Sequence, residues 1–95
     1  MSMAELVAAG APELPEGYFY RVAPSGLRGA VRVQVRRQRL IGSVEIERSV
    51  VIVAEHADAL SAVVFGCRNA SARMALHGDT RVESLYGDHD PRGGR

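Results

Sequence analysis

The fold is decided by residues 30–53, which read AVRVQVRRQRLIGSVEIERSVVIV. At the start of this stretch valines alternate with arginine and glutamine, which is the period-2 pattern of a half-buried strand. The alternation lapses before residues 40–43, where Gly42 can take the positive φ that a tight turn often needs. It resumes over residues 44–47 and ends in an apolar run. The stretch therefore predicts an antiparallel hairpin over residues 30–53.

A turn centred on Ile41 and Gly42 fixes which residues face each other across the hairpin, because residue i then lies opposite residue 83 − i. Polar pairs share one face: Arg36 with Glu47, and Gln38 with Glu45. Apolar pairs share the other face: Val33 with Val50, and Val31 with Ile52. Such cross-strand pairs contribute about 0.2–1 kcal/mol each, so the pattern and the turn agree on this register.

The residues on either side of the hairpin complete the predicted sheet and cover it. An aromatic and β-branched run over residues 18–22 suits a further strand. After residue 54 an apolar stripe recurs at spacings of three and four, made of Ala57, Leu60, Val64, Cys67, Ser71 and Met74. Gly66 weakens the middle of this segment and allows a kink or a break there, so we expect either one long helix or two short helices.

Together these elements predict an α+β fold, a three-stranded antiparallel sheet with the helix or helices packed on one face. The chain of 95 residues suffices for one domain and is too short for two. We expect an N-terminal leader over residues 1–16, where glycine and prolines interrupt any longer element. The single small domain would then span residues 17–86, and residues 87–95 would form a flexible tail.

Composition and charge argue against several classes of protein. The formal net charge is +1, which leaves no global field to recruit nucleic acid or an anionic membrane. The single cysteine, Cys67, can close no disulfide within the chain and favours a reducing compartment. The longest apolar stretch is interrupted by charged residues, and the N-terminus lacks the basic start of a signal peptide. We expect a soluble, cytoplasmic protein that does not associate with membranes.

The chain contains no motif of a known catalytic, metal or cofactor chemistry. Near the C-terminus, potential metal ligands gather without zinc-type spacing: His77, Asp79, Asp88, His89 and Asp90. Glu55, His56 and Asp58 are close in sequence, but adjacent helical residues do not face each other. Cys67 falls on the apolar stripe and is expected in the core. We therefore predict a protein that is not an enzyme, with no catalytic residue, metal or cofactor.

The arginines of the hairpin form the one cluster that suggests binding. Period 2 places Arg32, Gln34, Arg36 and Gln38 on one strand face, and Phe19 is expected to stay exposed on the reverse of its own strand. We take these five residues as the candidate interaction face. Three interpretations remain open for it: a solvated face paired with Glu45 and Glu47, a protein-binding face, and a β-ribbon that reads nucleic acid.

Three short stretches resemble small hypothetical proteins of actinobacterial phages. They are LPEGYFYRV at 14–22, VRVQVRR at 31–37 and YGD at 86–88. All twelve basic residues are arginine, which suits a GC-rich host, whereas the alanine- and valine-rich segment 54–76 departs from the resemblance. The resemblance implies a phage protein acting in the cytoplasm of a bacterial host, and it brings no catalytic residues with it.

One helix covers only one face of a three-stranded sheet, and the outer strands leave edges that can pair with another chain. We therefore predict a non-catalytic protein that acts by protein–protein interaction, either as a homo-oligomer or by binding a host protein. The alternative is a nucleic-acid-binding β-ribbon protein that uses the arginine and glutamine face of the strand.

Overall fold

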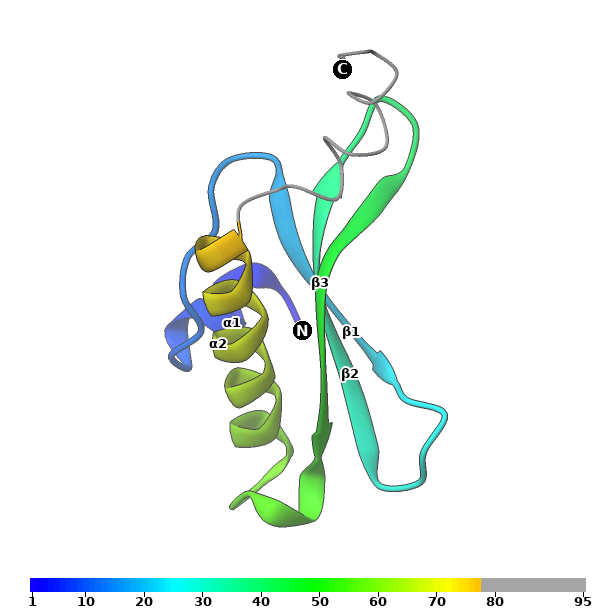
Figure 1. The fold of residues 1–95 in the computed structure, drawn as a ribbon. Helices are drawn as coiled ribbons and strands as arrows, with labels where there is room; N and C mark the ends of the chain where they lie inside the picture. The colour runs from blue at the N-terminus through cyan, green and yellow to red at the C-terminus, as the bar shows by residue number, and fades with distance from the viewer. Residues whose placement is uncertain (78–95) are drawn as a thin grey trace.

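The computed structural model describes residues 1–77, in which an antiparallel sheet carries helices on one of its two sides (Figure 1). In chain order the elements are α1 (Met3–Ala8), β1 (Tyr18–Pro24), β2 (Ala30–Gln38), β3 (Ser43–Ile52), the 3-10 helix η1 (Val53–Glu55) and α2 (Ala59–His77). The strand order is β1-β2-β3, and both neighbouring pairs are antiparallel. The predicted α+β fold is confirmed. The expected domain end at residue 86 and the tail 87–95 lie outside the described residues.

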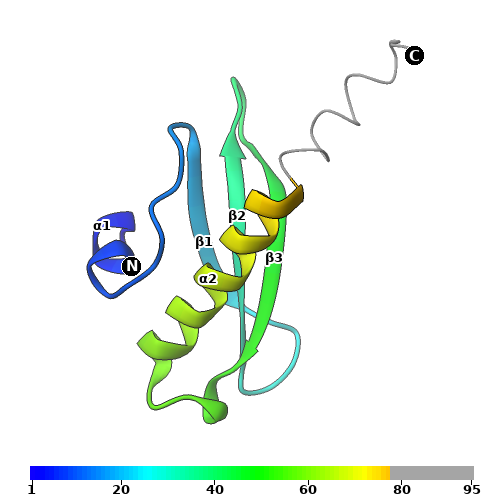
Figure 2. The same cartoon turned by 60° about the vertical axis from the view of Figure 1, so that its left-hand side comes forward.

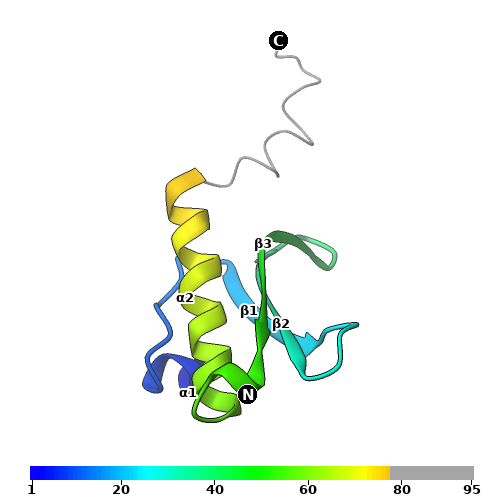
Figure 3. The ribbon, with the colours of Figure 1, turned by 60° about the horizontal axis from the view of Figure 1, so that its bottom comes forward.

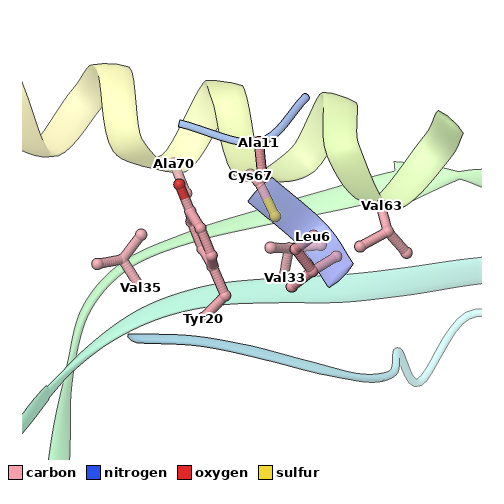
Figure 4. Close-up of a cluster of buried hydrophobic side chains, with 8 residues drawn as sticks. All are labelled: Leu6, Ala11, Tyr20, Val33, Val35, Val63, Cys67 and Ala70. Carbon is pink, nitrogen blue, oxygen red and sulfur yellow. The ribbon is translucent and has the colours of Figure 1, made fainter. Parts of the chain in front are cut away.

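The hydrophobic core lies between the sheet and the helices, as the close-up in Figure 4 shows. Alternate residues of β2 point into it, because successive side chains of a strand lie on opposite faces. From β1, Tyr20 contributes a buried ring, and its hydroxyl donates a hydrogen bond of 2.7 Å to the carbonyl of Pro12. The buried cluster consists of Leu6, Ala11, Tyr20, Val33, Val35, Val63, Cys67 and Ala70.

Helix α2 is one continuous helix of 19 residues, so of the two predicted alternatives the single long helix is confirmed. Its buried face also differs from the predicted stripe: Ala57 and Leu60 are exposed. The residues it buries are mostly small, namely Ala62, Val63, Val64, Gly66, Cys67 and Ala70. A Cβ on Gly66 would lie 2.7 Å from Val33 Cγ2, so the absent side chain lets the helix backbone approach the sheet. The glycine therefore serves close packing of the helix against the sheet.

Residues 1–16, expected as a leader, contribute to this core. A capping box starts α1, in which the Glu5 amide donates to Ser2 Oγ and the Ser2 amide donates to Glu5 Oε1. Leu6 follows on the inward face and is 1% exposed. The amide of Tyr20 donates to Met3 Sδ at 3.3 Å, which ties α1 to β1. Figure 2 shows α1 beside β1, on the same side of the sheet as α2.

The hairpin forms where the sequence predicts it, but its register differs from the prediction. Near the turn Arg36 lies opposite Glu45, and farther away Val33 lies opposite Ser49. The register shifts between Val35 and Arg36, where β3 carries Ile46 as an extra residue. A bulge changes the phase of side-chain alternation along its strand, so β3 does not follow one period-2 pattern from end to end.

Within residues 1–77, α1 and α2 are each too short or too polar to cross a membrane.

Candidate functional site

The candidate site is the face of the sheet that points away from α2, here called the open face. In Figures 1 and 2 both helices lie on the opposite side of the sheet. On β2 the open face carries Arg32, Gln34 and Arg36, because Val33 and Val35 between them point into the core. Phe19 of β1 pairs with Arg36 and so lies on the same face. Four of the five predicted interaction residues therefore share one surface.

The fifth predicted residue, Gln38, belongs to the turn of the hairpin. Its side-chain amide donates to the carbonyl of Arg39 at 3.2 Å and to that of Gly42 at 3.0 Å. Both acceptors lie in the loop between β2 and β3. Gln38 therefore holds the turn closed, and its side-chain amide is engaged there.

The bulge at Ile46 decides which acidic residue reaches the open face. Glu45 lies on this face, since its carboxylate accepts a hydrogen bond from the side-chain amide of Gln34. Glu47 lies on the helix side, where its carboxylate is 3.4 Å from Arg73 Nε and 3.9 Å from His77 Nδ1 of α2. The expectation that Glu45 and Glu47 together neutralise the arginine face is therefore wrong for Glu47.

A hydrogen-bond network fixes the part of the open face nearest the turn. Gln34 is 7% exposed, although it is polar and lies on the uncovered side. Its amide oxygen accepts from Arg36 Nη1 at 3.3 Å, and Arg36 Nε donates to Ser43 Oγ at 2.8 Å. Glu45 also accepts from Arg48 Nη2 at 3.2 Å. Arg36 and Arg48 thus spend much of their hydrogen-bonding capacity inside the protein.

Arg32 is in a different situation from Arg36. It lies between Ala23 of β1 and Val50 of β3, neither of which offers a polar side chain. Its Nε is buried and has no hydrogen-bond partner within residues 1–77. A buried donor left without a partner costs about 1–3 kcal/mol, so residues 1–77 leave a penalty at Arg32 that a ligand could remove.

Besides Arg48, sequence reasoning missed three residues of the open face. Arg21 pairs with Gln34 from β1, is exposed, and has no ion-pair partner in the described part of the chain. Val50 and Ile52 pair with Arg32 and Ala30 from β3 and remain partly exposed. Arg21 could have been found because it is two residues after Phe19 on one predicted strand. The two β3 residues could not, because the bulge reverses the predicted faces.

The remaining polar groups singled out in the sequence have structural roles or lie outside the described residues. Burial raises the pKa of the Cys67 thiol to about 11, as expected for a core cysteine. Asp58 accepts a hydrogen bond of 2.7 Å from the Ser61 amide at the start of α2, which lowers the pKa of its carboxyl. The His56 ring lies against Phe65, with ring centroids 4.8 Å apart.

Residues 1–77 contain no group of three acidic, histidine or cysteine side chains that could hold a metal ion. The C-terminal residues Asp79, Asp88, His89 and Asp90 are outside this range.

No protein-family model, curated protein or solved structure matches the chain. The resemblance to phage proteins therefore stays a prediction.

Proposed function

We propose that this is a non-catalytic binding protein whose open face docks on an acidic surface of another protein. The observation that carries the proposal is Arg32, whose buried Nε lacks a hydrogen-bond partner within the described residues. A carboxylate is the natural ligand for this group, because guanidinium and carboxylate form short, charge-assisted hydrogen bonds. The partner would complete a bond that residues 1–77 leave unmade.

The charges of the open face suit an acidic partner. Among the residues of strands β1 to β3, four arginines lie on it, at positions 21, 32, 36 and 48, against one carboxylate, that of Glu45. This local excess is hidden in the whole-chain net charge of +1. Complementary charge of this kind steers association and fixes the register of a complex.

The apolar groups on the same face favour a protein over a nucleic acid. Phe19, Val50 and Ile52 offer aromatic and aliphatic contact area beside the arginines. Aromatic residues and arginine are enriched in protein interfaces, and the anchors of such interfaces are commonly Trp, Tyr and Arg. Arg36 and Arg48 are already engaged with Ser43 and Glu45, so they supply little to a run of phosphates. If the phage resemblance holds, the partner is a protein of the bacterial host.

A nucleic acid is the second candidate, and one observation favours it. Arg21 and Arg32 lie diagonally across β1 and β2 without ion-pair partners among residues 1–77, and Phe19 is two residues from Arg21. An aromatic ring beside unpaired arginines is what single-stranded nucleic acid uses for stacking and backbone contacts. Each phosphate neutralised on a single strand would then lower log K by about 0.7 per unit of log salt.

The test places a photo-crosslinking amino acid at position 19 in place of Phe19 and exposes the protein to an actinobacterial lysate. We expect one protein product that disappears in the Arg32→Ala variant and persists in Arg68→Ala. Arg68 is a charge-matched control, because it lies on α2 and donates to the Gly10 carbonyl away from the open face. The purified partner should then bind the wild type at least tenfold more tightly than it binds Arg32→Ala.

Two results would overturn the proposal. One is a crosslinked product that does not depend on Arg32. The other is tight, steeply salt-dependent binding of a single-stranded oligonucleotide that is lost in Arg32→Ala, which would establish the second candidate.

A further inference from the structure

The loop between β2 and β3, here called the hairpin tip, presents two large apolar side chains to solvent. Leu40 is 100% exposed and Ile41 is 90% exposed. Single exposed apolar residues are common on protein surfaces, but two adjacent ones that no residue of 1–77 covers suit contact with another molecule.

Hydrogen bonds hold the tip in one conformation. The Arg39 amide donates to the Gly42 carbonyl at 2.9 Å, and Gly42 has a φ of 73°, which glycine adopts without strain. Gln38 donates to the same carbonyl, and Arg36 Nη2 donates to the Ser43 carbonyl at 3.0 Å. A loop that is already ordered loses less conformational entropy when it binds, so the tip is preorganised to dock.

A groove that suits this tip lies on α1 and the segment after it. It has a volume of about 510 Å³. Its lining is apolar except for one carboxylate and consists of Met3, Ala4, Val7, Ala8, Glu13 and Leu14. An apolar groove of this kind receives aliphatic side chains by removing both surfaces from water.

The charges around the tip and the groove have opposite signs. Arginines at positions 37 and 39 precede Leu40, whereas residues 1–20 contain three glutamates and no basic side chain. One of these glutamates, Glu13, lines the groove itself. The hairpin tip and the α1 groove therefore match each other both in apolar character and in charge.

The tip cannot enter the groove of its own chain. Figures 1 and 3 place the turn between β2 and β3 at one end of the sheet, far from helix α1. We propose that the hairpin tip of one copy docks in the α1 groove of a second copy. This contact is head-to-tail, because two different surfaces meet, so its repetition gives a ring or an open chain.

A lipid surface is the rival occupant for the tip, because apolar residues beside arginines also suit an anionic bilayer. A bilayer accounts for the tip but leaves the groove and its glutamate unexplained. A second copy accounts for both, and it involves surfaces that are separate from the open face.

The test is a complementation experiment by sedimentation velocity. One variant, Leu40→Ser/Ile41→Ser, removes the tip and keeps the groove. The other, Ala8→Arg, blocks the groove with a bulky cation and keeps the tip. We expect the wild type to grow in mass with concentration, and each variant alone to stay monomeric. An equimolar mixture of the two should form a dimer and nothing larger, since it holds one intact tip–groove pair.

Matched controls keep the result specific. Leu27→Ser makes the same change at an exposed leucine in the loop between β1 and β2, and it should assemble like the wild type. Arg32→Ala should also assemble, which separates this contact from the open face. Because Leu40, Ile41 and Ala8 are exposed, thermal unfolding should show that both variants remain folded.

Three outcomes would overturn the proposal. They are a wild type that stays monomeric up to its solubility limit, a mixture of the two variants that fails to associate, and assembly that survives the loss of the tip. Binding of a monomeric wild type to phosphatidylglycerol vesicles through Leu40 and Ile41 would assign the tip to lipid instead.

Discussion

Gly66 of α2 lies against Val33 of β2 so closely that no Cβ fits between them. A Cβ on Gly66 would be 2.7 Å from Val33 Cγ2 and 3.0 Å from Val51 Cγ2. Both valines are buried in β2 and β3, so neither side chain can move away into solvent. The distance between helix and sheet is therefore set by the absence of a side chain at this position.

The Gly66→Ala variant should be less stable than the wild type. Alanine gains about 1 kcal/mol in helix propensity, but overpacking a filled core costs about 1–3 kcal/mol. A contact of 2.7 Å is severe, so the cost should lie near the upper end of this range. We therefore expect the free energy of unfolding, measured with urea, to fall by about 1–2 kcal/mol. In a Val33→Ala background the same change should cost less, because the clashing methyl is gone. An equal cost in both backgrounds would contradict this packing argument.

Arg32→Met should stabilise the free protein while weakening partner binding. The substitution removes a buried Nε that has no hydrogen-bond partner within residues 1–77 and keeps a side chain of similar length. Relief of that penalty should raise the free energy of unfolding by about 1 kcal/mol. The control is Arg21→Met, at an exposed position on the neighbouring strand β1. It should change the free energy of unfolding by less than about 0.5 kcal/mol. A clear loss of stability in Arg32→Met would show that the guanidinium is satisfied in the free protein.

The protein should lose stability at alkaline pH through two buried acids. Burial raises the pKa of Cys67 to about 11 and that of Tyr20 to about 12, above their ordinary values of 9.0 and 10.0. Above pH 9 the unfolded chain therefore releases protons that the folded protein retains, so the free energy of unfolding falls as pH rises. Guanidinium unfolding at pH 8 to 11 measures this, and Cys67→Ala should reduce the slope that begins near pH 9. The folded thiol should also react with iodoacetamide far more slowly than the unfolded one.

Leu6→Ala should show that α1 is part of the folded unit. Leu6 is 1% exposed and belongs to the main core cluster, so its truncation should cost about 2–5 kcal/mol. Val7→Ala is the adjacent control, because Val7 is half-buried on the groove side and should cost much less. Thermal unfolding of the two variants makes the comparison. Equal losses would mean that α1 adds little to the core.

The sheet and its helix could be predicted from the sequence, because the alternation typical of strands gives way near residue 54 to the spacing of three and four that is typical of helices. The sequence was insufficient for the register of the hairpin. Val44 and Ile46 are two residues apart, and the next buried residues of β3 are Ser49 and Val51, so the alternation changes phase. The run of apolar residues from Val50 onward hides that change, because apolar side chains there occupy both faces.

The packed face of α2 and the contribution of α1 to the core could not be predicted, for a related reason. Searching for large apolar residues on α2 favoured Leu60, whereas the packed face includes Ala62, Gly66 and Ala70 at spacings of four. Small residues carry little hydrophobic signal, although they permit the closest contact with a sheet. Leu6 stands in a six-residue helix among alanines, where a short element leaves almost no periodicity to detect.

The bulge at Ile46 also limits how another chain can approach β3. This strand is an edge of the sheet, and a regular edge of ten residues would offer a template for a further strand. The extra residue breaks the even spacing of backbone donors and acceptors near the middle of that edge. An incoming strand could match only one half of β3 at a time, which protects crowded copies of this protein from merging into a continuous sheet.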